Sequence, residues 1–588
     1  MDNLLNFTDK MKALNIDAYL ITTTDYHMSN FTAEYFHVMN FLINFSKKNA
    51  KLVITKEYSY LFIDTKYYQE ALEKVNTKII KIIKEDESDE TFEEFLGNLL
   101  KDNETFAFDS KSVSTSLIES IRRQISSSIK IISEIDLANT IWNNRPELPF
   151  SLVYELDPYF SGITYSDKIT MVREKIKKYN SEAFVLSNLS SQAWLYNLRG
   201  NDIVNNPLFL SYTIIENDKV TLFIDERKID NDVEKYLEEN NVDIKPYNDF
   251  YTYLSTIKAK KVLIDKKNTS YKISSTLKSV GNVIINIDDP IILLKAIKNE
   301  TEIKNIKNAY IKDGVIYVKS LYNIKQSYIS SEQFSELSIA DLIDGKRREV
   351  EGFVDSARKT NVSFNQNTGS PSYRPTIETS SVFKDNGTIL IDFATHYLNG
   401  TTKLARTVSL GKTPDLLKTY YTTVLKANID LSKEIFIKGL KGFNLDIIVK
   451  TPIWSLGLDY KNETGYGVDY LASLNEGPNI ISYKDLGASV IYPNMVTVIE
   501  PGIYIENKYG VKLSSSLLCV KNDEANDNFN TFENITIAPF ERDLIKTSLL
   551  TKDEKEWLNK YHEKVYNTLE KYLTNDEKEF LKHLCEKI

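Results

Sequence analysis

The sequence predicts an α/β protein built from several domains. Its 588 residues are enough for several domains and a large buried core. Patterns typical of strands and of helices alternate through the first half, which favours mixed sheets flanked by helices. The order of these patterns in residues 1–143 is repeated in residues 144–290, which suggests two related domains.

In the first segment, apolar spacing predicts a helix from Leu4 to Leu14, followed by strands at residues 18–22 and 51–54. In the second segment, a helix over residues 166–180 leads to a strand over residues 183–187. Both segments therefore begin with the same helix–strand unit.

The third domain is predicted to span residues 291–588. It begins with an amphipathic helix, because Ile303, Ile306 and Tyr310 have helical spacing. Charged amphipathic helix is predicted again at the end of the chain, as an extension from about residue 546.

Composition excludes some functions. The chain is 42% apolar and 26% charged, with a net charge of −9, which argues against nonspecific nucleic-acid binding. No stretch approaches the ~18 apolar residues of a membrane span, and the first residues lack a basic region followed by an apolar core. Two cysteines give no disulfide framework. We expect a cytoplasmic protein with no nucleic-acid partner and no membrane partner.

The last third contains a series of short sequence motifs, called words below, that look like a remnant metal site. Asp392 ends an apolar strand pattern, and Lys403 follows the turn signal Asn-Gly. Tyr466 lies in Thr-Gly-Tyr-Gly, Glu500 in Ile-Glu-Pro-Gly, and Ser514 in Gly-Val-Lys-Leu-Ser-Ser.

These words, in this order, resemble the catalytic domain of aminopeptidase P, a family that removes an N-terminal residue preceding proline. The resemblance implies a "pita-bread" fold and a site in which two aspartates, one histidine and two glutamates hold two divalent ions, usually manganese. Asp392 and Glu500 match the first aspartate and the first glutamate of that pattern. The second aspartate falls on Lys403, the histidine on Tyr466 and the second glutamate on Ser514.

The resemblance extends to substrate-site positions and to the first two domains, which look like the creatinase-like N-terminal domains of the three-domain members. Two family histidines fall on Asn475 and Ser372, and an arginine that contacts peptide falls on Lys66. A solvated lysine at a strand end is an equally good interpretation of Lys66. His27 lies in a word of the first domain and is expected to belong to the scaffold.

Ligand chemistry then argues against the family reaction. Oxygen-binding divalent ions need about six ligands, and a two-metal site needs bridging carboxylates. We therefore expect no cofactor, and two manganese ions only if an unrecognised metal site exists. We hypothesise that the Lys403 ammonium replaces metal by pairing with Asp392 and Glu500, because unpaired buried carboxylates are costly. The alternative is that Lys403 turns to solvent.

Other routes to catalysis are weakly supported. No histidine lies in a catalytic word that should carry one, and His396 is expected to be an ordinary strand-end residue rather than a ligand or base. Cys519 and Cys585 are expected to be buried residues that fill space in the core and have no catalytic role. Tyr466 together with Asp469 and Glu476 remains a weaker candidate for a new oxygen site.

The resemblance therefore implies a catalytically inactive relative of aminopeptidase P that binds peptides or regulates. We expect a peptide with N-terminal Xaa-Pro as ligand, and a homodimer or a heterodimer with an active paralogue. The alternative is an active Xaa-Pro metallo-aminopeptidase with a non-standard metal site. A protein-binding module like the inactive domain of a histone chaperone would predict a long acidic run, but residues 85–90 form only a short one.

Overall fold

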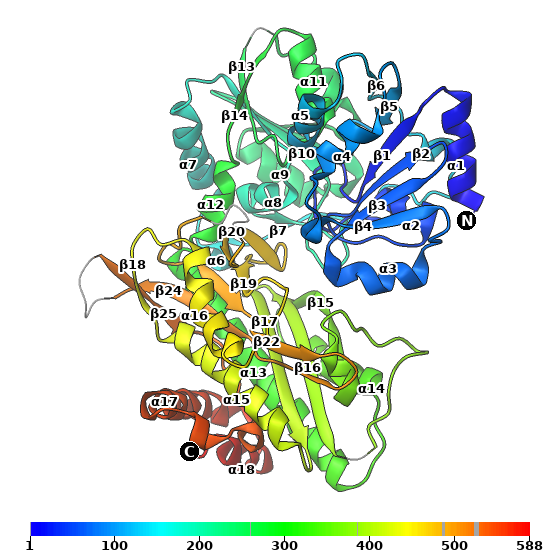
Figure 1. Ribbon diagram of the computed structural model, residues 1–588. Helices are drawn as coiled ribbons and strands as arrows, with labels where there is room; N and C mark the ends of the chain where they lie inside the picture. Colours follow the sequence, from blue (N-terminus) through cyan, green and yellow to red (C-terminus); the bar gives the residue numbers. More distant parts are fainter. Residues whose placement is uncertain (1, 259, 385, 485–488, 523–527) are drawn as a thin grey trace. The chain divides into compact units, whose positions relative to one another are not determined.

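The computed structural model describes residues 2–258, 260–384, 386–484, 489–522 and 528–588. The chain divides into two compact units (Figure 1). The first contains residues 1–155 and 164–291, and the second contains residues 156–163 and 292–588.

The first unit holds two six-stranded sheets of identical topology. The central strand β1 pairs antiparallel with β2 and parallel with β5, just as β8 pairs antiparallel with β10 and parallel with β13. The strand orders are β4-β3-β2-β1-β5-β6 and β12-β11-β10-β8-β13-β14. The expected repetition is therefore present in the sheets, while the predicted domain boundaries at 143 and 290 stay predictions.

The strands of the first sheet are β1 (Ala18–Thr22), β2 (Lys51–Thr55), β3 (Ser59–Ile63), β4 (Ile80–Lys84), β5 (Thr105–Phe108) and β6 (Lys130–Ile132). Those of the second are β8 (Ala183–Leu186), β10 (Ser211–Glu216), β11 (Val220–Ile224), β12 (Val242–Pro246), β13 (Lys261–Ile264) and β14 (Val283–Asn286), and β7 (Tyr154–Glu155) pairs with β9 (Leu198–Arg199). The helices around them are α1 (Asp2–Ala13), α2 (Val38–Ile43), α3 (Tyr68–Lys74), α4 (Phe92–Leu99), α5 (Thr115–Gln124), α7 (Tyr165–Lys177), α8 (Leu189–Tyr196), α9 (Asn231–Glu239), α10 (Phe250–Leu254) and α11 (Tyr271–Ser279).

His27 lies between the two sheets of this unit. Its Nδ1 is 3.1 Å from the carbonyl oxygen of Ser187, and its Nε2 is 2.9 Å from the hydroxyl of Tyr247. Burial lowers the pKa of His27 to about 3, so the ring is neutral and joins the two halves of the unit by hydrogen bonds.

The second unit is built around three sheets. Strands β15 (Phe353–Phe364), β16 (Gly387–Tyr397) and β17 (Gly400–Leu410) form one, and β22 (Gly502–Ile505) pairs with β23 (Tyr509–Lys512). The third has the order β18 (Ile435–Ile437), β25 (Phe529–Asn534), β24 (Ser515–Lys521), β21 (Val496–Ile499), β19 (Gly465–Val468) and β20 (Asn475–Ile481). Its helices are α6 (Pro158–Ser161), α13 (Glu300–Ile329), α14 (Glu336–Arg348), α15 (Asp415–Ser432), α16 (Gly442–Trp454), α17 (Lys552–Leu569) and α18 (Asn575–Leu584), and α12 (Pro290–Ala296) crosses the boundary between the units.

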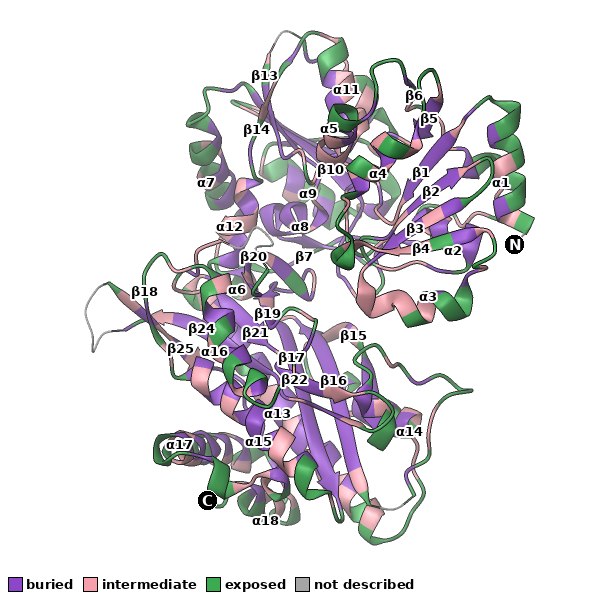
Figure 2. Cartoon of the chain, in the orientation of Figure 1, coloured by how far each residue is buried: buried purple, intermediate pink, exposed green. Residues whose placement is uncertain are grey.

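The hairpin β16–β17 forms the centre of this unit. Every residue of β17 is buried, and so is every residue of β16 after its first (Figure 2). The long helix α13 packs on β17 and starts at a capping box in which Asn299 and Glu302 cap each other. The amphipathic helix predicted from the spacing of Ile303, Ile306 and Tyr310 is thus the first part of a longer element. Among the described residues, no helix combines the length and the apolar character needed to cross a membrane.

A buried arginine joins the hairpin to the C-terminal segment. Arg406 on β17 donates to the carbonyl oxygens of Ser514 at 2.5 Å, Ala538 at 3.1 Å and Pro539 at 3.2 Å. Backbone carbonyls in a buried region need donors, and one planar guanidinium supplies several of them here. This contact fixes the segment that follows β23 against β17.

We predict opposite effects for alanine at two helical glycines. A Cβ at Gly314 on α13 would clash with the carbonyl oxygen of Ile537, whereas a Cβ at Gly345 on α14 would meet nothing within 4 Å. Gly314→Ala should lower the free energy of unfolding by about 2 kcal/mol because the backbone must shift. Gly345→Ala should raise it by up to about 1 kcal/mol through helix propensity. Denaturant titration measures both, and equal effects would contradict the close approach at Gly314.

We also predict an acid-sensitive contact at His562 on α17. Its Nε2 accepts a hydrogen bond from the backbone N–H of Phe540 at 3.2 Å, and burial together with Arg406 and Arg542 lowers its pKa from 6.5 to about 3. Between these values the unfolded chain binds the extra proton, so stability falls as the pH falls. His562→Gln should remove up to about 1.4 kcal/mol of this loss per pH unit, measured by denaturation at several pH values. His583→Gln, at an exposed position, should leave the slope unchanged.

Candidate functional site

The β16–β17 hairpin and the β21–β23 segment bring four charged side chains together. In the hairpin, Asp392 lies opposite Ala405 and Lys403 lies opposite Ala394, so Asp392 and Lys403 are diagonal neighbours on one face of the sheet. Glu500 follows β21, and Lys512 is the last residue of β23. The site therefore depends on elements that are separated by about a hundred residues of sequence.

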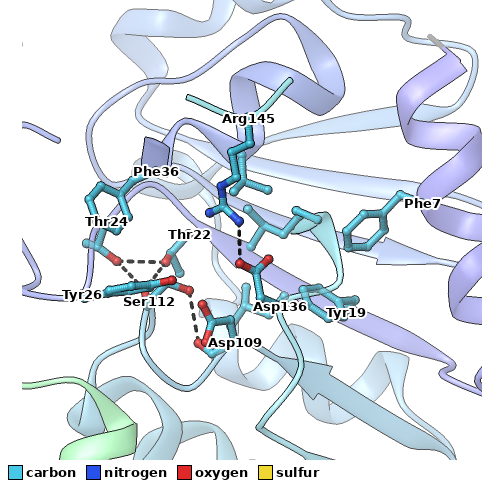
Figure 3. A pocket seen from close by; sticks show the side chains of 14 residues that line it. Phe7, Tyr19, Thr22, Thr24, Tyr26, Phe36, Asp109, Ser112, Asp136 and Arg145 are labelled. Carbon is cyan, nitrogen blue, oxygen red and sulfur yellow. Dashed lines mark hydrogen bonds and ion pairs between the residues drawn. The ribbon is translucent and has the colours of Figure 1, made fainter. Parts of the chain in front are cut away.

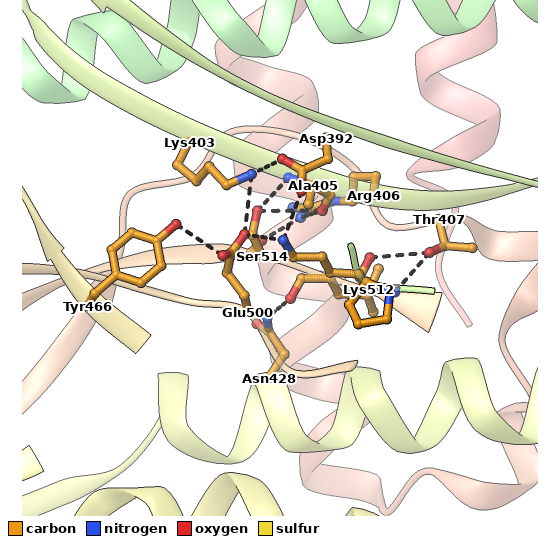
Figure 4. A network of polar contacts seen from close by, with 12 residues as sticks. Asp392, Lys403, Ala405, Arg406, Thr407, Asn428, Tyr466, Glu500, Lys512 and Ser514 are labelled. Atoms are coloured by element: carbon orange, nitrogen blue, oxygen red, sulfur yellow. Dashed lines mark hydrogen bonds and ion pairs between the residues drawn. The ribbon is translucent and has the colours of Figure 1, made fainter. Parts of the chain in front are cut away.

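Both lysines bridge both carboxylates (Figure 4). Lys403 Nζ contacts Asp392 Oδ1 and lies 3.3 Å from Glu500 Oε1. Lys512 Nζ lies 2.8 Å from Asp392 Oδ2 and 2.8 Å from Glu500 Oε1. We call these four residues the lysine–carboxylate network. Each carboxylate is neutralised from two directions, which removes the repulsion between them.

Glu500 remains ionised in this setting. Burial alone would raise its pKa, but the charges of Lys403, Lys512 and Arg358 together lower it below its ordinary value of 4.5. The hydroxyl of Tyr466 donates a hydrogen bond of 3.0 Å to Glu500 Oε2. A buried carboxylate that accepts charged and neutral donors at once is held firmly as an anion.

The pKa values of Lys403, which belongs to the network, and of Tyr466, which donates to it, are shifted in opposite directions. Burial, with added repulsion from Lys512 and Arg358, lowers the pKa of Lys403 well below its ordinary value, while Glu500 opposes that change. Burial and the charge of Glu500 raise the pKa of Tyr466 well above its ordinary value. The hydroxyl of Tyr466 therefore stays protonated.

The remaining predicted site residues do not join this network. Ser514 is buried, and its Oγ accepts from the backbone N–H of Ala405 at 2.5 Å. Asn475 at the start of β20 and Ser372 in the loop after β15 are both exposed. Lys66 belongs to the first unit, where its Nζ lies 3.1 Å from Asp64 Oδ2 and 5.2 Å from the ring of Tyr67.

The weaker candidate, an oxygen site formed by Tyr466, Asp469 and Glu476, does not form. Lys295 Nζ lies 2.8 Å from Asp469 Oδ2 and 2.7 Å from Glu476 Oε2. Lys298 Nζ lies 2.5 Å from Glu476 Oε1. Lysines thus occupy these carboxylates too, because buried charges need partners, and the Tyr466 hydroxyl is bonded to Glu500 instead.

His396 and the two cysteines lie where structural residues are expected. His396 is fully buried on β16, and its Nδ1 is 2.9 Å from Thr401 Oγ1 across the hairpin. Cys519 is buried on β24, and Cys585 is half-buried beyond the end of α18. Burial raises the pKa of each thiol to about 12, so neither is a reactive thiolate.

The sequence did not predict two residues of the site, Lys512 and Arg358. Lys512 was read only as part of the word that contains Ser514, although residues two apart on an extended segment face the same side. Arg358 on β15 lies opposite Ala394, which lies opposite Lys403 on β17. Arg358 and Lys403 therefore lie at the same level of the three-stranded sheet, and the charge of Arg358 acts on Lys403, a proximity that only strand pairing reveals.

The first unit contains a separate small cavity of about 30 Å³ (Figure 3). Its lining includes Asp136 and Arg145, whose side chains pair at 2.5 Å, and the hydroxyls of Thr22 and Thr24, which both bond to the carbonyl oxygen of Ser112. A cavity of this size has room for about one or two water molecules. It is too small for a peptide.

Comparisons with known proteins cover nearly the whole chain. Residues 4–141 and 144–302 each match the Creatinase/Prolidase N-terminal domain, residues 304–521 match Metallopeptidase family M24, and residues 528–588 match the C-terminal region of peptidase M24. A protein of Dictyostelium discoideum named Xaa-Pro aminopeptidase 1 is 33% identical, over 97% of this chain and 94% of its own. A Neurospora crassa protein named "Probable Xaa-Pro aminopeptidase P" is 32% identical over 97% of this chain and 86% of its own.

A solved structure is similar over the full length. The X-prolyl aminopeptidase of Caenorhabditis elegans, described as a cytosolic enzyme with a di-nuclear active site, has a TM-score of 0.93 and 28% identity, and the match covers 100% of both chains. Our expectation that no cofactor is used is therefore wrong in the light of this relative and of the M24 match. The expectation rested on the number of matching ligands that this sequence retains.

The residues at this position nevertheless do not fit two metal ions in the conformation described. Lys403 and Lys512 contact the same carboxylate oxygens that would have to bind the ions. Among the residues that the structure describes, no group of three or more His, Cys, Asp or Glu side chains could hold an ion. The two lysines and a metal pair are thus alternative occupants of Asp392 and Glu500.

We predict that Lys403 stabilises the site by charge. Lys403→Met should lower the free energy of unfolding at neutral pH by about 3 kcal/mol, because two buried carboxylates then share one lysine. The loss should shrink below the ordinary glutamate pKa of 4.5, where the unfolded chain takes up the proton first. Denaturant titration between neutral and acid pH measures both effects. Lys508→Met, at an exposed residue of the same segment, should change stability by less than about 0.5 kcal/mol.

Proposed function

Because the chain belongs to the aminopeptidase P family of M24 metallopeptidases, whose members are named Xaa-Pro aminopeptidases, we propose that it is a peptide-binding or regulatory member that does not hydrolyse its ligand. One observation supports this proposal above all. Both retained acidic residues of the site, Asp392 and Glu500, are held in ion pairs with Lys403 and Lys512.

No group of the network is free to move a proton, because even Lys403, whose pKa burial lowers, is held between Asp392 and Glu500. A general base must accept a proton near neutral pH, but the carboxylate of Glu500 has a lowered pKa and the hydroxyl of Tyr466 has a raised one. His396 is bonded across the hairpin to Thr401. Water activation by the residues of this site would therefore require the network to break.

A second candidate function is active Xaa-Pro metallo-aminopeptidase, which removes an N-terminal residue before proline. The comparisons favour it over the inactive proposal, because the relatives carry that name and the similar enzyme from C. elegans has a di-nuclear active site. For this function Lys403 and Lys512 would have to leave the carboxylates so that ligands could bind there. Two manganese ions are the cofactor that we associate with this candidate.

The remaining expectations are proposals of the same kind. We infer a ligand with N-terminal Xaa-Pro from the names of the relatives. A cytoplasmic location is consistent with the relative described as cytosolic. We infer a homodimer or a heterodimer with an active paralogue, and the heterodimer would let a non-hydrolysing subunit regulate a catalytic one.

One experiment separates the two candidates. The full chain is purified without chelator, incubated with and without manganese, and assayed for binding and for hydrolysis of the same Xaa-Pro peptides. The inactive candidate predicts that the peptides are bound and recovered intact with either preparation, whereas the C. elegans enzyme hydrolyses them under the same conditions. Metal content is measured on the same samples. Manganese-dependent turnover with stoichiometric metal would instead establish the second candidate.

A further inference from the structure

Basic side chains outnumber acidic ones around the network. Asp392 and Glu500 supply two negative charges, whereas Lys403, Lys512 and Arg358 supply three basic side chains. The additional base is Arg358, which lies opposite Ala394 on one side of β16 as Lys403 does on the other. Neighbouring strands are about 4.8 Å apart, so the backbones of Arg358 and Lys403 are separated by roughly 10 Å.

All the carboxylate oxygens of the network are already committed. Asp392 Oδ1 pairs with Lys403 and its Oδ2 with Lys512. Glu500 Oε1 lies within ion-pair distance of both lysines, and its Oε2 accepts from Tyr466. In the described parts of the chain, none of these oxygens forms an ion pair with Arg358.

The Arg358 side chain is half-buried, and its guanidinium makes no ion pair or hydrogen bond with another residue in the described parts of the chain. Beside it lies a small apolar cluster of Ala357, Ala394 and Leu474, against which the ring of Tyr466 packs. A guanidinium carries donors in a planar fork that matches the two oxygens of a carboxylate. An apolar wall next to it lowers the local dielectric and strengthens such a pair.

We propose that Arg358 binds a carboxylate carried by the peptide ligand, so that the site prefers acidic peptides to their neutral counterparts. This inference rests on the proposed function, because it names the class of peptide that the same site selects. The lysines pair directly with the chain's own acidic residues, whereas Arg358 acts on Glu500 through its charge alone, so that its planar donors can bind an acid from outside. Selection would therefore depend on the charge of a ligand side chain, in addition to proline.

The test compares peptides that differ in one charge. Xaa-Pro peptides with amidated C-termini carry a single glutamate at the first or the third position, and each is paired with a peptide that has glutamine at the same position. Calorimetric titration of the wild-type chain should show at least one position at which glutamate binds about tenfold or more tightly than glutamine, as a charge-assisted pair would give. Amidation ensures that the side chain is the only carboxylate.

Variants identify the residue responsible. Arg358→Gln should abolish the preference for glutamate, and Arg358→Lys should retain part of it because the charge is kept while the fork is lost. Lys359→Gln removes the adjacent exposed lysine and should leave the preference intact. Thermal unfolding of each variant verifies the fold.

The outcomes separate the inference from the function on which it rests. Equal binding of glutamate and glutamine peptides would overturn the inference while leaving peptide binding in place. A preference that survives Arg358→Gln would overturn the assignment to Arg358. Failure of every peptide to bind would overturn the proposed function, and the inference with it.

Discussion

The structure of the site depends on one electrostatic arrangement, in which two lysines lie between two buried carboxylates. Asp392 and Glu500 come from different sheets, and without a cation between them their mutual repulsion would push β16 and the end of β21 apart. Two unit charges about 5 Å apart repel by roughly 3 kcal/mol at an effective dielectric of 20. Lys403 and Lys512 turn this repulsion into attraction, since each contacts both acidic residues.

The surrounding frame explains why these side chains keep their places. Arg406 fixes the segment after β23 by donating to the Ser514 carbonyl, and Ser514 in turn accepts from the backbone of β17. Residue 514 thus serves strand packing in this chain. A second pairing of two lysines with two buried carboxylates lies in the same unit, where Lys295 and Lys298 neutralise Asp469 and Glu476. At both places in the second unit, a pair of buried acidic residues is neutralised by a pair of lysines.

Much of the fold could be predicted from local patterns. The strand at 18–22 agrees with β1, and the strand at 183–187 with β8 to within one residue, because alternation and apolar runs are local signals. The resemblance of short words in order predicted the family, which the comparisons confirm. Helix ends were less certain. The helix predicted over 166–180 ends at Lys177, since helix termini depend on contacts beyond the local pattern.

Some residues of the site could be predicted from the sequence, but most of the contacts between them could not. The sequence could place Lys403 beside Asp392, because they belong to one hairpin. It could not join Lys512 or Arg358 to them, because those contacts depend on the pairing of distant strands. Nor could ligand counting decide the cofactor, where the metal-dependent relatives contradict our expectation.

The reciprocal pairing also constrains the order in which this site can change during evolution. If one lysine mutated to an acid, three carboxylates would face a single ammonium, and the fold would weaken before any new property arose. Intermediates of this kind are removed by selection when stability is marginal. Descendants of this chain are therefore expected to retain both lysines or to replace them together. The paired charges thus make single substitutions at either position unfavourable.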